Sequence, residues 1–166
     1  MLALSRAQVP QLAFLRRLIE EVGSAKELLE NASHIQDIVP DATPRLVSLL
    51  TDRSLVELAE REMEFIEKNN IKLICMGDEA YPCRLSECDD APLVLHSMGN
   101  ADLNARHIVS IVGTRHASEY GKELCANFVA DLAKFVPGTL VVSGLAYGID
   151  VCAHRAAIKY NLATVG

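Results

Sequence analysis

Two short glycine-containing segments hold the residues of this sequence best suited to binding a phosphate. The first, Gly113-Thr114-Arg115, follows the apolar run 108–112. A glycine after a buried strand lets the backbone turn sharply beside a ligand, and a nearby arginine can grip a phosphate through two parallel hydrogen bonds. Ser118 is placed to cap the next helix. Gly121, near the start of that helix, leaves room for a ligand or another backbone segment. The pattern predicts a phosphate contact; a solvated Arg115 on an ordinary turn is the alternative.

The second segment, residues 143–150, combines Ser143, Gly144 and Gly148 with the start of a helix. Backbone N–H groups in such a loop form an anion-binding nest, and the helix dipole adds partial positive charge. Asp150, in the first helical turn, either caps the helix or contacts the ligand. His154 lies four residues further along the same helical face, and we interpret it as a structural partner of Asp150 rather than a catalyst.

Signatures of catalysis are missing around both segments. The glycine spacing matches neither the dinucleotide fingerprint nor a P-loop, and the sequence has no GxSxG or HExxH motif. Cys83 and Cys88 have a spacing compatible with zinc but no second ligand pair nearby. The odd number of cysteines, five, and the lack of a secretion signal lead us to expect reduced thiols. The two segments therefore predict a cradle for a phosphate backbone, with no catalytic residues, metal or cofactor.

Alternating strands and helices must position these segments. Residues 105–166 read as β-α-β-α-β, with strands at 108–112, 139–143 and 162–165 and helices at 121–136 and 149–160. The carboxyl ends of parallel strands meet at one edge of a sheet, so the two segments should lie side by side there. We expect the first helix to turn four side chains toward the sheet: Leu124, Phe128, Val129 and Leu132.

The preceding half of the chain reads as mostly helical up to about residue 69. Ser24 with Glu27 and Ser54 with Glu57 each match a capping box, which marks the start of a helix. Short apolar runs at 71–75 and 92–96 then predict two strands.

Charge is distributed unevenly along the 166 residues. Residues 1–104 contain 10 Lys and Arg against 18 Asp and Glu, a net charge of −8, whereas residues 105–166 contain 6 against 4, a net charge of +2. Phosphate binding requires positive potential only where the ligand lies, so the overall charge of −6 does not exclude it. The sequence shows no run long enough to span a membrane and no signal peptide, which predicts a cytoplasmic protein.

Several motifs in this order resemble the DNA-processing protein A family, also called DprA or Smf. The resemblance rests on Ile111-Val112-Gly113-Thr114-Arg115 with Ser118 and Tyr120-Gly121, on Val142-Ser143-Gly144-Leu145-Ala146 with Gly148-Ile149-Asp150 and Ala153-His154, and on the upstream Gly77-Asp78, Tyr81-Pro82 and Ala91-Pro92. It implies an α/β protein: an N-terminal helical, SAM-like domain (residues 1–70), then the first part of an extended Rossmann-like parallel sheet (residues 71–166), apparently truncated.

The resemblance also implies a function. Family members bind single-stranded DNA without catalysis, form homodimers and load the RecA recombinase onto DNA during natural transformation. The DNA-binding residues that it implies here are Gly113, Arg115, Ser118, Gly121, Ser143, Gly144, Ala146, Tyr147, Gly148, Ile149, Asp150 and His154.

The sequence departs from the family pattern in three places. Tyr147 stands where the family usually has Lys or Arg, so it either stacks on a base or is an ordinary loop residue. The hairpin expected near Gln8-Val9-Pro10-Gln11 lacks glycines, and the family's Rossmann domain extends beyond Gly166. Two other readings stay open: a nucleotide-processing enzyme of the phosphoribohydrolase type, and an acidic N-terminal domain that binds only other proteins.

Overall fold

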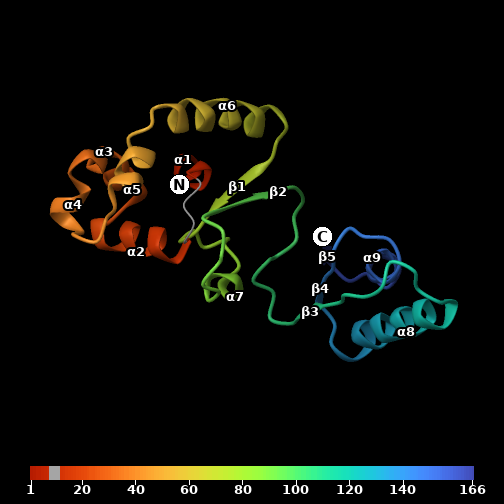
Figure 1. Cartoon of the computed structure of the whole chain (residues 1–166). Coiled ribbons are helices and arrows are strands. Elements are labelled where there is room, and N and C mark those ends of the chain that lie inside the picture. Colours follow the sequence, from red (N-terminus) through yellow and green to blue (C-terminus); the bar gives the residue numbers. More distant parts are fainter. Residues whose placement is uncertain (8–11) are drawn as a thin grey trace. The chain divides into compact units, whose positions relative to one another are not determined.

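The computed structural model describes residues 1–7 and 12–166, and the hairpin expected at residues 8–11 lies outside these (Figure 1). The chain divides into two compact units, Met1–Met98 and Gly99–Gly166. No helix in the described residues is both long and apolar enough to cross a bilayer.

Helices make up most of the first unit, and most of them contribute residues to one apolar core. They are α1 (Leu2–Arg6), α2 (Leu12–Val22), α3 (Ala25–Glu30), the 3₁₀ helix η1 (Ala32–His34), α4 (Ile35–Ile38), α5 (Pro44–Leu50), α6 (Ser54–Lys68) and α7 (Cys83–Ser86). Leu4, Leu15, Leu18, Leu28 and Ile35 are completely buried in that core. The mainly helical organisation expected for this part of the chain is confirmed.

Of the two serine caps predicted in the first unit, one is confirmed and the other is wrong. The Ser24 hydroxyl accepts a hydrogen bond from the Glu27 backbone N–H at 3.1 Å, as predicted. At α6, Ser54 is already the first helical residue, and the Asp52 carboxylate accepts a 2.9 Å hydrogen bond from its N–H. An aspartate two residues upstream can reach a backbone N–H in this way, so it takes the place of the Ser54 hydroxyl.

A two-stranded antiparallel sheet completes the first unit. Strand β1 (Lys72–Cys75) pairs with β2 (Val94–Ser97), so that Lys72 faces Ser97 and Cys75 faces Val94. Leu93 and Val94 are buried in the same core as the helices. The structure therefore divides after Met98 rather than at residue 70, because these strands share the helical core.

The second unit is a three-stranded parallel sheet with two crossover helices (Figure 1). Its elements are β3 (Ile108–Ser110), α8 (Glu119–Phe135), β4 (Leu140–Val142), α9 (Ile149–Lys159) and β5 (Thr164–Val165). The strand order β3-β4-β5 places β3 and β5 at the edges, with Ser110 beside Val142 and Val142 beside Val165. The predicted β-α-β-α-β arrangement is confirmed.

Two of the four α8 side chains predicted to face the sheet lie beside its edge strand but are not covered. Leu124 and Phe128 are 58% and 48% exposed, whereas Cys125 and Val129 are buried. Cys125 and Val129 share a core with Val141 and the α9 alanines. The helix therefore turns its buried side partly toward α9, and Leu124 and Phe128 border a shallow apolar groove beside the edge strand β3.

Candidate functional site

The loop after β3 and the loop after β4 touch each other. Gly148 has a φ of +87°, and a β-carbon there would overlap the Thr114 carbonyl oxygen and lie 2.8 Å from that of Arg115. The Ile149 N–H also donates to the Thr114 carbonyl oxygen at 3.2 Å. Only glycine permits this conformation and this close approach. The predicted adjacency of the two segments is thus present in the structure.

Asp150 holds the two loops together from the inside. Its side chain is only 5% exposed, and its carboxylate accepts a 3.3 Å hydrogen bond from the Gly113 N–H. The other carboxylate oxygen lies beside Gly144, where a β-carbon would come within 2.7 Å of it. Asp150 thus supports the loops, and the Gly113 N–H already has an acceptor within the protein.

Ser143 and His154 also support the loops. The buried Ser143 hydroxyl donates to the Ile111 carbonyl oxygen at 2.7 Å. His154 Nδ1 lies 2.7 Å from the Thr164 hydroxyl, and its Nε2 lies 3.2 Å from the Gly144 carbonyl oxygen. The structure gives His154 no hydrogen bond to Asp150 within its described residues, so the interpretation of His154 as the partner of Asp150 is wrong.

Other predicted site residues lie on the exposed side of these loops. Arg115 is exposed, and Tyr147 is 83% exposed in the loop that also contains the half-buried Ala146. Ser118 caps α8 as predicted, since its hydroxyl accepts a 3.2 Å hydrogen bond from the Gly121 N–H. A β-carbon at Gly121 would meet only ordinary contacts, so this glycine is not needed for close approach.

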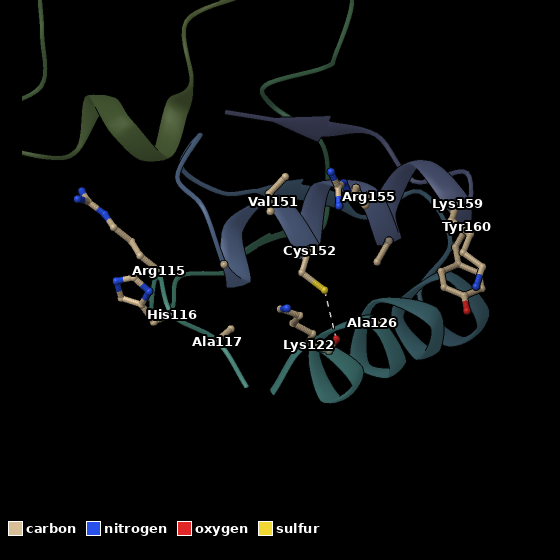
Figure 2. A pocket seen from close by; sticks show the side chains of 12 residues that line it. Arg115, His116, Ala117, Lys122, Ala126, Val151, Cys152, Arg155, Lys159 and Tyr160 are labelled. Carbon is tan, nitrogen blue, oxygen red and sulfur yellow. Dashed lines mark hydrogen bonds between the residues drawn. The ribbon is translucent and has the colours of Figure 1, made fainter. Parts of the chain in front are cut away.

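A groove between α8 and α9 begins at this pair of loops (Figure 2). Its volume is about 550 Å³, and Gly148 lies in its lining. The lining contains Arg115, Lys122, Arg155 and Lys159, together with His116, and no aspartate or glutamate. Four of the six Lys and Arg residues between positions 105 and 166 therefore gather here.

Sequence reasoning missed Lys122, His116, Arg155 and Lys159. The sequence did indicate a basic helix face here, because Arg155 and Lys159 are spaced i, i+4 and so share one face of α9. That face differs from the one that buries Ala153 and Ala157. The contribution of Lys122 depends on how α8 packs against α9, which no local pattern shows.

The charges of the groove are largely available to a ligand. Lys122 Nζ lies 2.7 Å from a Glu119 carboxylate oxygen, but that carboxylate is 92% exposed, and exposed pairs of this kind are weak. Within the described part of the chain, neither Arg115 nor Arg155 forms an ion pair. The groove therefore presents net positive charge to solvent.

Two cysteines lie close to each other near the groove. The Cys152 thiol donates to the Lys122 carbonyl oxygen at 3.2 Å (Figure 2). Burial, together with the neighbouring Cys152, raises the pKa of Cys125 to about 11. The described residues also contain no group of three or more His, Cys, Asp or Glu side chains that could hold a metal ion. The arrangement is suited to binding an anion.

Comparison with known proteins identifies the family. The family model for DNA recombination-mediator protein A matches residues 72–166, which is more than half of the chain. The chain belongs to the DNA recombination-mediator protein A family. The match includes both loops and all four groove cations.

Relatives of this recombination-mediator chain carry related names. It is 33% identical over 107 residues to the DNA processing protein DprA of Bacillus subtilis, covering 64% of this chain and 35% of that protein. It is 39% identical over 88 residues to DprA of Streptococcus pneumoniae, covering 53% of this chain and 30% of that protein. The chain thus spans about a third of the length of the curated relatives that it matches.

A solved structure shows the same fold. The X-ray structure of DNA processing protein A from Streptococcus pneumoniae superposes with a TM-score of 0.52 at 23% identity. The superposition covers 92% of this chain and 56% of that one. The recombination-mediator chain is therefore a mixed α/β protein in which helices precede a parallel sheet, as its sequence predicts.

Proposed function

We propose that this chain binds single-stranded DNA through its two adjoining loops, without catalysis. The observation that supports this most directly is the contact between Gly148 and the Thr114–Arg115 backbone. This contact brings the exposed Arg115 to one end of the groove between α8 and α9. All the charged residues in the lining of that groove are Lys or Arg. A guanidinium there can form paired hydrogen bonds with a phosphate.

The supporting residues and the contacting residues have different roles in this proposal. Asp150, Ser143 and His154 hold the loops in place through the hydrogen bonds described above. Arg115 and the backbone of the Gly144–Gly148 loop contact phosphates, and the exposed Tyr147 ring stacks on a base. Stacking on an aromatic ring contributes about 1–3 kcal/mol per base in proteins that bind single strands.

Membership of the recombination-mediator family extends the proposal to the whole protein. We propose that it acts in the cytoplasm as a homodimer and loads the RecA recombinase onto single-stranded DNA during natural transformation. RecA filament assembly on DNA coated with single-strand-binding protein tests this step. Addition of the protein should shorten the lag before assembly, and an unchanged lag would count against loading.

An oligonucleotide titration tests the DNA-binding proposal. The chain and its Arg115→Ala variant are titrated with a labelled oligonucleotide at several salt concentrations, with Lys134→Ala as the control. Lys134 carries the same charge in the same unit but lies outside the groove lining. Loss of one phosphate contact should weaken binding and reduce the salt slope by about 0.7. Equal affinity and slope for all three proteins would exclude Arg115 from the site.

A further inference from the structure

The groove between α8 and α9 extends well past the loops. In Figure 2, Arg115 and His116 lie at one end, Lys122 lies beside the middle of the view, and Lys159 and Tyr160 lie at the other end. The α9 helix rises about 1.5 Å per residue, so from Val151 to Lys159 the lining covers about 12 Å of its length. This distance is too long for a single phosphate contact.

Small side chains form much of the groove lining. Ala117, Ala126, Cys152 and Ala156 line it between the cations. They leave space for the backbone of a ligand to approach the two helices closely. The volume of about 550 Å³ is in the range of small-molecule pockets.

The far end of the groove is organised around an aromatic ring. The Lys159 ammonium lies 5.1 Å from the centre of the Tyr160 ring, within the range of a cation–π contact. This contact limits the positions of a flexible lysine side chain at the groove. The contact keeps the Lys159 charge close to Tyr160 at this end of the groove.

We propose that the groove is a track for the backbone of a single strand that leaves the two loops, with Lys122, Arg155 and Lys159 contacting successive phosphates beyond the one bound by Arg115. This inference rests on the proposed function and adds the path of the strand. It predicts that the binding footprint grows along α9, from its N-terminus toward Tyr160. Short strands engage only the loops, and longer strands also engage Lys159.

A length series of oligothymidylates provides the test. The matched variants are Lys159→Ala and Lys134→Ala. Each removes a lysine near the end of its helix whose ammonium lies over the aromatic ring of the next residue. The distance from Nζ to the ring centre is 5.1 Å for Tyr160 and 4.9 Å for Phe135. We expect the two variants to bind the shortest oligonucleotides equally well. With longer strands, Lys159→Ala should lose part of the affinity gain and about 0.7 of the salt slope, whereas Lys134→Ala should keep both.

Two further variants sharpen this result. Replacing Lys122, Arg155 and Lys159 together by alanine should reduce the slope by about 2 while leaving the Arg115 contact in place. Glu119→Gln should instead strengthen binding of the longer strands, because it removes the carboxylate 2.7 Å from Lys122. Circular dichroism of each variant verifies its fold, and Lys159→Gln replaces Lys159→Ala if that variant unfolds.

The failure of this inference is distinguishable from the failure of the proposed function. If Lys159→Ala and Lys134→Ala behave alike at every length while Arg115→Ala still weakens binding, the track is overturned and the loop site stands. If no variant changes the binding of any oligonucleotide, both are overturned. Displacement of the long strands by a polyglutamate peptide as readily as by a competing oligonucleotide would assign the groove to acidic partners instead.

Discussion

Gly148 lies so close to Thr114 that no β-carbon fits between its Cα and the Thr114 carbonyl oxygen. This contact joins loops that are more than 30 residues apart in sequence, and it brings Arg115 to the groove. Position 148 therefore requires glycine.

Gly148→Ala should destabilise the protein and weaken oligonucleotide binding. The substitution adds strain at a φ of +87° and a collision with Thr114, so we expect a loss of about 2–4 kcal/mol in the free energy of unfolding. Gly138→Ala is the control, because its φ is +81° with nothing within 4 Å of the added carbon. It should cost only the strain, about 1–2 kcal/mol. Equal losses in urea unfolding would show that the contact between the loops is unimportant.

Asp150→Ala should destabilise the loops more than Asp150→Asn. Alanine leaves the Gly113 N–H without its acceptor, and the loss of this hydrogen bond should cost about 1 kcal/mol. Asparagine keeps one oxygen that can accept this hydrogen bond, so its cost should be smaller. Urea unfolding of the two variants measures the difference. An alanine variant as stable as the asparagine variant would contradict the supporting role of the carboxylate.

Glu62→Gln should destabilise the first unit in a pH-dependent way. The Glu62 carboxylate accepts a hydrogen bond from Arg6, which lowers its pKa, and the charges of Arg6 and His96 lower it further. A lowered pKa in the folded state stabilises the protein above the unfolded-state pKa of about 4.3, and this contribution is lost as the pH falls through the folded-state value. Because the Arg6 side chain is 50% exposed, we expect a loss of only about 1 kcal/mol at pH 7.

Thermal unfolding of the Glu62 variant between pH 7 and pH 3 measures this dependence. The difference from the unaltered chain should shrink as the pH falls. Glu64→Gln is the control, because Glu64 is exposed on the same helix. A constant difference across this range would mean that the charge of Glu62 does not stabilise the fold.

Cys125 should react with alkylating reagents much more slowly than Cys88. Only the thiolate is nucleophilic, and a pKa of about 11 leaves very little of it at pH 7. Cys88 is exposed, whereas Cys125 is buried. Mass spectrometry after a short treatment with iodoacetamide gives the extent of labelling at each residue. The difference should disappear in urea, and equal rates in the folded protein would contradict the environment described for Cys125.

Local patterns in the sequence determined the elements and the approximate position of the site. The cap residues Ser24 and Ser118 were predictable because each hydroxyl bonds an N–H only three residues away. The two loops were predictable as neighbours because consecutive parallel strands end at the same edge of a sheet. The helical first half and the β-α-β-α-β second half were predictable from the spacing of apolar residues.

Only the tertiary structure decided what individual side chains do. Asp150 bonds Gly113, 37 residues away, and His154 bonds Thr164 and Gly144, so both stabilise the loops instead of each other. Lys122 joins Arg155 and Lys159 only because α8 packs on α9, and Leu124 stays exposed because it lies beside the edge strand β3. The side of a helix that is buried depends on its neighbours, and those neighbours are brought together by segments distant in the chain.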